Sequence, residues 1–199
     1  MTKITFARHG ETEENEAKIV QDQIGGKLTE KGREQTKKLA KRLSEEEFDA
    51  IYCSDSERTK ETAKEIAKYH KTPIGYREEL REINRGETIG ISTEKLWKEF
   101  EKSRETLAEW KPNGGESPLE QQKRVEKFLK ELVRKHQGQD VLLITHGGVC
   151  RSIWNLCNNT LPDMNHADKN KMENGSLSQL EVKNNQFKLL AYNSTEHLK

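Results

Sequence analysis

The 199-residue chain carries 35 lysines and arginines against 34 aspartates and glutamates, which leaves a net charge of +1. This balance removes the bulk electrostatic attraction that a nucleic acid or an anionic membrane would require, and the length suits one well-buried domain better than two. The first residues are polar, and no apolar run reaches about 18 residues, the length of a membrane span. Three scattered cysteines, Cys53, Cys150 and Cys157, form no CxxC pair, so we expect reduced thiols, no metal site and a cytoplasmic protein.

A strand is expected over residues 4–8, because its members are largely apolar and Gly10 ends the run. Hydrophobic spacing and turn residues predict the further elements in chain order: a helix over 28–47 with Thr29 as its N-cap, a strand over 48–54, a helix over 56–70, an irregular stretch over 71–90, helices over 93–110 and 118–136, a strand and a helix over 140–159, and a hairpin over 175–193. The apolar run "VLLI" after residue 140 does not alternate, which is typical of a parallel strand buried on both faces. We therefore expect an α/β fold of three layers, with helices on both sides of a mostly parallel central sheet and the hairpin at its edge.

Charged and imidazole side chains follow the ends of three expected strands. Arg8 and His9 end the first strand, Arg58 comes shortly after the second, and His146 and Gly147 follow the last parallel strand. Ligands of such sheets gather outside the carboxyl ends of the strands, so we expect these residues to share one crevice. The planar guanidinium suits phosphate oxygens, and the free amides of the following helix favour the same anion. Neighbouring cations disfavour an imidazolium ion, so His9 is expected to be neutral near pH 7 and able to attack phosphorus.

Several short motifs carry a resemblance to a known family. They are "RHGET" from residue 8, the downstream Asn15, "LTEKGREQ", "SDSERTKETA", "LREINRGE", "GGES" and "THGG", in this order. Together they resemble the histidine phosphatase superfamily, the phosphoglycerate mutase-like proteins, over essentially the whole chain. The resemblance implies a phosphoglycerate mutase-like fold, one domain over residues 1–199 with a lid-like insertion at about 80–115, and no cofactor.

The resemblance also implies roles for the residues at the strand ends. His9 would be the nucleophile that becomes phosphohistidine, and Arg8, Arg58 and His146 would clamp the phosphoryl oxygens. No metal is required for such a step, since guanidinium and imidazole groups stabilise the equatorial oxygens as Mg²⁺ does elsewhere. Further residues expected to contact the phosphate or the substrate are Asn15, Gln21 and Gly147.

Glu82, in "LREI", falls where the family places the proton donor to the leaving oxygen. A general acid at this position contributes about 10² to 10⁴ in rate. As a carboxylate, Glu82 would then activate the water that cleaves the phosphohistidine. Three other roles stay open. Glu11 either orients the nucleophile region or caps the following turn, and Glu87 matches the family without a defined role. Gly115, Glu116 and Ser117 in "GGES" either belong to the site or form the start of a helix with Ser117 as its N-cap.

The chain departs from the family near the substrate's leaving group. Ile19 stands where family phosphatases often have arginine, Asp22 follows Gln21 in place of glycine, and "GETIG" replaces "GEWEG". The loop from 158 to 174 mixes charges such as Asp163 and Asp168 with lysines. The mixed charge indicates a small polar phosphomonoester as substrate, but the sequence does not distinguish an α-ribazole phosphatase, a sugar phosphatase or a broad-specificity enzyme.

Three functions are compatible with these motifs. Hydrolysis of a small phosphorylated metabolite is favoured, because cofactor-dependent phosphoglycerate mutases are typically longer and read roughly "ERHYG" where this chain has "EINRG". A mutase must also exclude water from the phosphoenzyme, which usually takes extra covering segments. The third function is a non-catalytic protein that binds a phosphorylated ligand, which would have lost His9, Glu82 or an arginine. None of these is lost.

Overall fold

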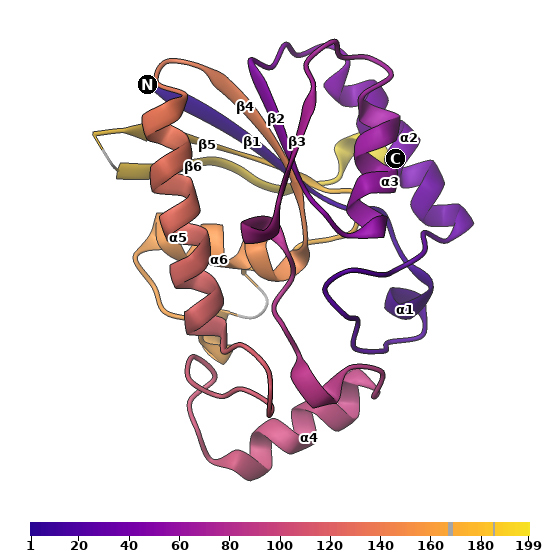
Figure 1. Ribbon diagram of the computed structural model, residues 1–199, viewed down its shortest axis with the longest axis vertical. Coiled ribbons are helices and arrows are strands. Elements are labelled where there is room, and N and C mark those ends of the chain that lie inside the picture. Colours follow the sequence, from indigo (N-terminus) through magenta and orange to yellow (C-terminus); the bar gives the residue numbers. More distant parts are fainter. Residues whose placement is uncertain (167–168, 185) are drawn as a thin grey trace.

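A six-stranded sheet forms the centre of the protein in the computed structural model, which describes residues 1–166, 169–184 and 186–199. Its strands lie in the order β3-β2-β4-β1-β5-β6 (Figure 1). Their bounds are β1 Thr2–Arg8, β2 Ala50–Ser54, β3 Ile74–Arg77, β4 Asp140–Thr145, β5 Leu177–Lys183 and β6 Gln186–Ser194. Strands β1 to β4 are parallel, whereas β5 runs antiparallel to β1 and pairs with β6 as the edge hairpin. The mostly parallel sheet and its closing hairpin are therefore confirmed. Two residues named in the sequence predictions, Asp168 in the loop 158–174 and Asn185 in the range 175–193, lie outside the described residues.

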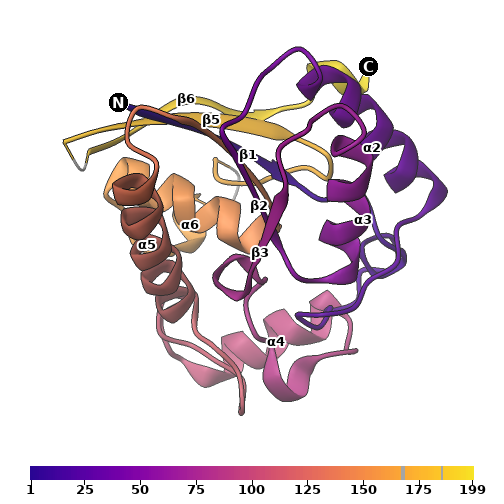
Figure 2. The ribbon, with the colours of Figure 1, turned by 45° about the horizontal axis from the view of Figure 1, so that its top comes forward.

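Helices cover both faces of this sheet (Figures 1 and 2). Helices α2 and α3 lie on one face, and α5 and α6 lie on the other. The bounds are α1 Glu13–Glu16, α2 Glu30–Leu43, α3 Glu57–Ile66, α4 Thr93–Ser103, α5 Pro118–Lys135 and α6 Gly147–Asn158. Helix α4 lies beyond the sheet, at one end of the molecule (Figure 1). The expected three-layer α/β architecture is confirmed.

Both faces of strand β4 are buried, which explains why its apolar run does not alternate with polar residues. Val141 and Leu143 belong to the core under α5 and α6, whereas Leu142 and Ile144 belong to the core under α2 and α3. All four side chains are fully buried. Because successive side chains of a strand point to opposite faces, a strand covered by helices on both sides must be apolar at every position.

Side-chain caps fix where two of the helices begin. Thr29 accepts a hydrogen bond from the amide of Gly32 at 2.9 Å, as predicted for the start of α2. Ser117 accepts from the amide of Glu120 at 3.1 Å, and the Glu120 carboxylate accepts from the Ser117 amide at 2.8 Å. This capping box satisfies two donors that the first turn of α5 leaves open, and Pro118 adds a favoured first residue. The N-cap role considered for Ser117 is the one the structure shows.

The helix expected over 93–110 was predicted too long. Helix α4 ends at Ser103, because Arg104 adopts a left-handed backbone with φ of 59°. Trp110 is nevertheless buried, and it packs with Leu96 in a small separate cluster. The apolar spacing beyond residue 103 therefore reflects a loop that buries Ala108 and Trp110 and not a longer helix.

The stretch 71–90, expected to be irregular, contains the edge strand β3. This strand has only four residues, and Gly75 lies so close to the Tyr52 ring that a Cβ would stand 2.9 Å from it. A short strand with a glycine and no clear alternation gives little periodic signal. The helices expected over 28–47 and 56–70 also end earlier, at Leu43 and Ile66.

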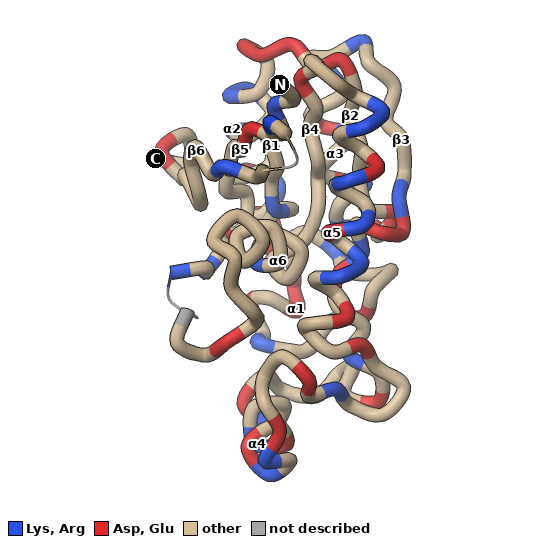
Figure 3. Tube along the Cα trace, turned by 90° about the vertical axis from the view of Figure 1, so that its left-hand side faces the viewer, with Lys and Arg blue, Asp and Glu red and all other residues tan. Residues whose placement is uncertain are grey.

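Charges of both signs are interspersed along the chain, including α4 (Figure 3). Many pair within one helix, as Lys98 does with Glu94 at 2.6 Å. Exposed pairs of this kind add only about 0.3–0.5 kcal/mol each. None of the helices in the described part of the chain has the length and apolar character that crossing a bilayer would need.

Candidate active site

The carboxyl ends of β1, β2 and β4 bring the predicted residues together. Arg8 ends β1, Arg58 lies in the first turn of α3, and His146 is the residue immediately before α6. The rings of His9 and His146 are 5.2 Å apart between centroids. Arg58 Nε donates to His146 Nδ1 at 3.3 Å. His9, Arg58 and His146 are each at most 3% exposed, so these residues form one buried, cationic crevice.

Both histidines are neutral near pH 7. The pKa of His9 lies well below its usual 6.5 because burial disfavours the charged form, and the charges of Arg58 and Arg8 and the neighbouring His146 lower it further. Burial, then Arg58 and Arg8, likewise holds the pKa of His146 well below 6.5. Neutral imidazole retains a lone pair, which a nucleophile requires.

The hydrogen bonds define which nitrogen carries that lone pair. His9 Nδ1 is 2.7 Å from the Gly10 carbonyl oxygen, and because a carbonyl only accepts, Nδ1–H is the donor and Nε2 is left with the lone pair. At His146, Nδ1 accepts from Arg58, so Nε2–H donates to Ser54 Oγ at 2.9 Å. The site therefore holds a neutral His9 whose Nε2 is free to attack.

The two arginines are fixed by backbone carbonyls but keep donors for an anion. Arg58 donates to the carbonyls of Asp22, at 3.0 Å, and Gly25. Arg8 donates to the Met172 carbonyl. Its buried Nε has no hydrogen-bond partner among the described residues, and a Cβ on Gly147 would lie 3.4 Å from it. A buried donor without an acceptor is costly, so this N–H is suited to a ligand oxygen.

Asn15 and Gln21 lie beside this crevice. Asn174 Nδ2 donates to Asn15 Oδ1 at 3.0 Å and to the His9 carbonyl at 3.2 Å. The Asn15 oxygen also accepts from the Thr12 amide as part of the α1 cap, which leaves its NH₂ group available. The buried Oε1 of Gln21 has no donor within the described part of the chain. Both predicted residues thus retain polar groups that a ligand can use.

Glu82 is bound at the first turn of α6. Its carboxylate accepts from the amide of Gly148 at 2.9 Å, from the amide of Ile83 at 2.8 Å and from Gln121 Nε2 at 3.1 Å. Burial alone would raise the pKa of this carboxyl, but the hydrogen bonds, with the charge of Arg151, outweigh it and lower the pKa to about 2. A Cβ on Gly148 would lie 2.0 Å from Glu82 Oε1, so any side chain at the second position of "GG" would displace this carboxylate.

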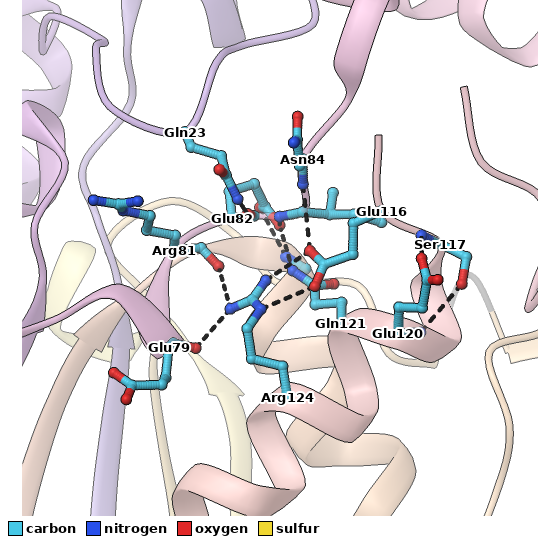
Figure 4. A network of polar contacts seen from close by, with 12 residues as sticks. Gln23, Glu79, Arg81, Glu82, Asn84, Glu116, Ser117, Glu120, Gln121 and Arg124 are labelled. Carbon is cyan, nitrogen blue, oxygen red and sulfur yellow. Dashed lines mark hydrogen bonds and ion pairs between the residues drawn. The ribbon is translucent and has the colours of Figure 1, made fainter. Parts of the chain in front are cut away.

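A network around Arg124 holds the backbone that carries Glu82 (Figure 4). Arg124 donates to the carbonyls of Glu79 and Arg81 at 2.6 and 3.1 Å, and it forms two hydrogen bonds to the Glu116 carboxylate at 2.9 and 2.7 Å. Sequence reasoning missed Arg124, because one arginine among the charged residues of a helix gives no signal of its own. The role of "GGES" becomes clear here, since its glutamate anchors this network.

The two glutamates whose roles stayed open, Glu11 and Glu87, have hydrogen-bond partners in other segments than that of His9. Glu11 binds Lys31 at 2.7 Å and accepts from Thr29 Oγ1 at 3.0 Å, so it ties the segment after β1 to the start of α2. The N-cap of the following helix α1 is Thr12, so the capping alternative for Glu11 is not what the structure shows. Glu87 accepts from Asn113 at 3.3 Å and joins two exposed loops.

A cavity of about 100 Å³ lies next to Glu82. Gln121 and Gly148, which both bind the Glu82 carboxylate, line it. Arg85 and Arg151 line it as well, and neither was predicted from the sequence. The described residues contain no group of three or more His, Cys, Asp or Glu side chains arranged to hold a metal ion.

Relatives with names from two enzyme groups match the chain. A metal-independent phosphoserine phosphatase from Arabidopsis thaliana is 32% identical over 209 residues, covering 100% of this chain and 84% of that protein. A probable phosphoglycerate mutase from Photorhabdus laumondii is 34% identical over 151 residues, covering 74% of this chain and 70% of that protein. The relatives therefore carry names from both the phosphatase and the mutase groups.

Solved structures agree with the fold over its whole length. YhfR from Bacillus stearothermophilus matches with a TM-score of 0.91 and 30% identity, covering 100% of both chains. A phosphoserine phosphatase mutant from Entamoeba histolytica, in complex with phosphoserine, matches with a TM-score of 0.86 and 26% identity, again covering 100% of both. The model of the histidine phosphatase superfamily (branch 1) matches residues 4–195. The chain therefore belongs to the histidine phosphatase superfamily.

Proposed function

We propose that the chain is a metal-independent phosphomonoesterase that acts through a phosphohistidine at His9 on a small phosphorylated metabolite. The observation that carries this proposal is the pairing of a neutral His9, whose Nε2 is free, with the guanidinium groups of Arg8 and Arg58 in one buried crevice. These cations bind the phosphate dianion and stabilise the charge that develops on its oxygens. The relative named a metal-independent phosphoserine phosphatase supports the same chemistry.

In the first step His9 Nε2 attacks phosphorus, the P–N bond forms and the bond from phosphorus to the ester oxygen breaks. His146 donates to the phosphoryl oxygens through the N–H that otherwise binds Ser54. Glu82 protonates the departing oxygen. Without substrate the Glu82 carboxyl is ionised, since its pKa is about 2, but a bound dianion beside it raises that pKa because like charges disfavour ionisation.

In the second step the carboxylate of Glu82 removes a proton from water as the water oxygen attacks phosphorus. The P–N bond breaks, and neutral His9 and inorganic phosphate are released. One carboxyl thus serves as acid and then as base, which is consistent with its position at the amide end of α6 next to the leaving-group cavity.

We further propose that residues 1–199 form one domain, with 80–115 as a lid over the crevice. Helix α4 contributes Trp97 to the cavity lining, which supports this role. The substrate partner is a small phosphorylated molecule. The free cysteines Cys53 and Cys150 are buried, and such thiols suit the cytoplasm.

The proposal is tested by assaying the purified protein in EDTA with a panel of small phosphomonoesters. We expect phosphate release that survives EDTA and disappears in His9→Ala. Conversion of 3-phosphoglycerate to 2-phosphoglycerate with bisphosphate cofactor, without phosphate release, would instead establish a mutase. Binding of phosphorylated ligands without any turnover would establish a non-catalytic protein.

A further inference from the structure

Asn174, in the loop before β5, contacts two segments of the phosphate crevice. Its Nδ2 donates to Asn15 Oδ1 at 3.0 Å and to the His9 carbonyl at 3.2 Å. An amide nitrogen carries two N–H bonds, so these contacts use both of its donors. One side chain therefore ties the loop to the proposed nucleophile and to a residue expected to contact the phosphate.

The Asn15 amide is held in one orientation by two donors. Its Oδ1 accepts from the Thr12 amide at 3.3 Å and from Asn174 Nδ2 at 3.0 Å, and the second contact is the shorter. If the amide turned over, its NH₂ group would face two N–H groups that cannot accept, which is costly. The NH₂ group of Asn15 makes no hydrogen bond with another described residue. Both of its N–H bonds are therefore available to an anion.

The backbone of His9 depends less on Asn174 than the Asn15 amide does. The His9 carbonyl also accepts from the Gly175 amide at 3.1 Å, and the His9 amide donates to the Thr145 carbonyl at 3.1 Å. Removal of the Asn174 donors leaves both of these bonds in place. The loss should therefore fall on the orientation of Asn15 and not on the position of the nucleophile.

We propose that Asn174 is a positioning residue, which keeps the NH₂ group of Asn15 directed at the phosphoryl group during transfer. The proposal rests on the proposed phosphatase function and adds a residue that the sequence motifs did not indicate. Arg8 and Arg58 attract the anion by charge, whereas the neutral Asn15 amide contributes only when its N–H bonds point at an oxygen. A hydrogen bond to a charged acceptor is stronger than one between neutral groups, so this orientation affects the rate.

Steady-state kinetics with p-nitrophenyl phosphate in EDTA test this role. Asn174→Leu removes both donors and keeps a side chain of similar size. The same substitution is made in the Asn15→Ala background, where no amide is left to orient. Asn158→Leu is the matched control, because Asn158 is exposed, lies at the opposite end of α6 from His146, and donates only to the Trp154 carbonyl at 2.8 Å.

Asn174→Leu should lower kcat/KM by about 10- to 100-fold, the effect of one lost hydrogen bond to a charged group. In the Asn15→Ala background it should lower kcat/KM by less than about 3-fold, because residues that act through one contact are not additive. Asn174→Asp should cost at least as much as Asn174→Leu, since its carboxylate accepts from the Asn15 NH₂ group and turns that amide away from the anion. Asn158→Leu should leave kcat/KM unchanged.

NMR of isotope-labelled protein reports the Asn15 amide without turnover. The pair of side-chain NH₂ signals that is missing from Asn15→Ala belongs to Asn15. Saturating inorganic phosphate should shift this pair in the native protein and in Asn158→Leu, and much less in Asn174→Asp. The measurement follows the signals of folded molecules, so partial unfolding of a variant does not imitate the expected result.

Three results would overturn the positioning role. They are a loss of less than about 3-fold in Asn174→Leu, an equal loss in the Asn15→Ala background, and an unchanged phosphate shift in Asn174→Asp. In each of them the native protein still hydrolyses p-nitrophenyl phosphate in EDTA, so the proposed phosphatase function stands. Absence of hydrolysis of every ester by the native protein would instead overturn that function and this role with it.

Discussion

Replacing Gly148 by alanine tests how the protein positions Glu82, the proposed general acid. The alanine Cβ would lie 2.0 Å from Glu82 Oε1, whereas real Cβ atoms essentially never approach another atom within 3.0 Å. Glu82 must therefore withdraw by about 1 Å, and displacement of a reacting group by about 1 Å can cost about 100-fold in rate. We expect kcat/KM for an alkyl phosphate to fall by about that factor.

The assay compares an alkyl phosphate with p-nitrophenyl phosphate in EDTA. The p-nitrophenolate leaving group needs little protonation, so kcat/KM for p-nitrophenyl phosphate, which reports only the first step, should fall much less in Gly148→Ala. Equal losses on both substrates, or no loss on the alkyl phosphate, would refute the reasoning.

Three further outcomes are expected. Glu82→Gln should lower kcat/KM for esters with poor leaving groups far more than for p-nitrophenyl phosphate, and equal losses of kcat/KM would reduce Glu82 to a positioning residue. Arg124→Gln should lower the free energy of unfolding by about 1.5–3 kcal/mol, since it breaks a charge-assisted pair with Glu116; a change below 0.5 kcal/mol in urea unfolding would contradict the network. His9 and His146 have lowered pKa values in the folded protein. Near pH 6.5 the unfolded chain therefore binds protons at these two imidazoles, whereas the folded protein does not. Stability should therefore decrease as pH falls below about 6.5, and His9→Ala should weaken this dependence; identical pH profiles would refute it.

The convergence of Arg8, His9 and His146 in one crevice is predictable from the sequence because these residues follow strand ends. Arg8, His9 and His146 need only a parallel sheet and correct strand boundaries to converge, and apolar patterning supplies both. The start of α2 at Thr29 is equally local, since a cap depends on residues within one turn.

Other parts of the site depend on contacts between segments far apart in the chain. Arg124 reaches carbonyls more than forty positions away, and no local pattern records such a contact. Arg85 and Asn170 meet at one cavity although 85 positions separate them. Strand β3 and the end of α4 were mispredicted for a related reason, because tertiary packing of Trp110 and Gly75 decides those segments.

The most direct test of the central claim is mass spectrometry of the enzyme quenched in alkali during turnover, where a phosphohistidine survives. We expect one added phosphoryl group on the peptide that contains His9, absent from His9→Ala and present in EDTA. Phosphoryl transfer to another residue, or full turnover in His9→Ala, would contradict it.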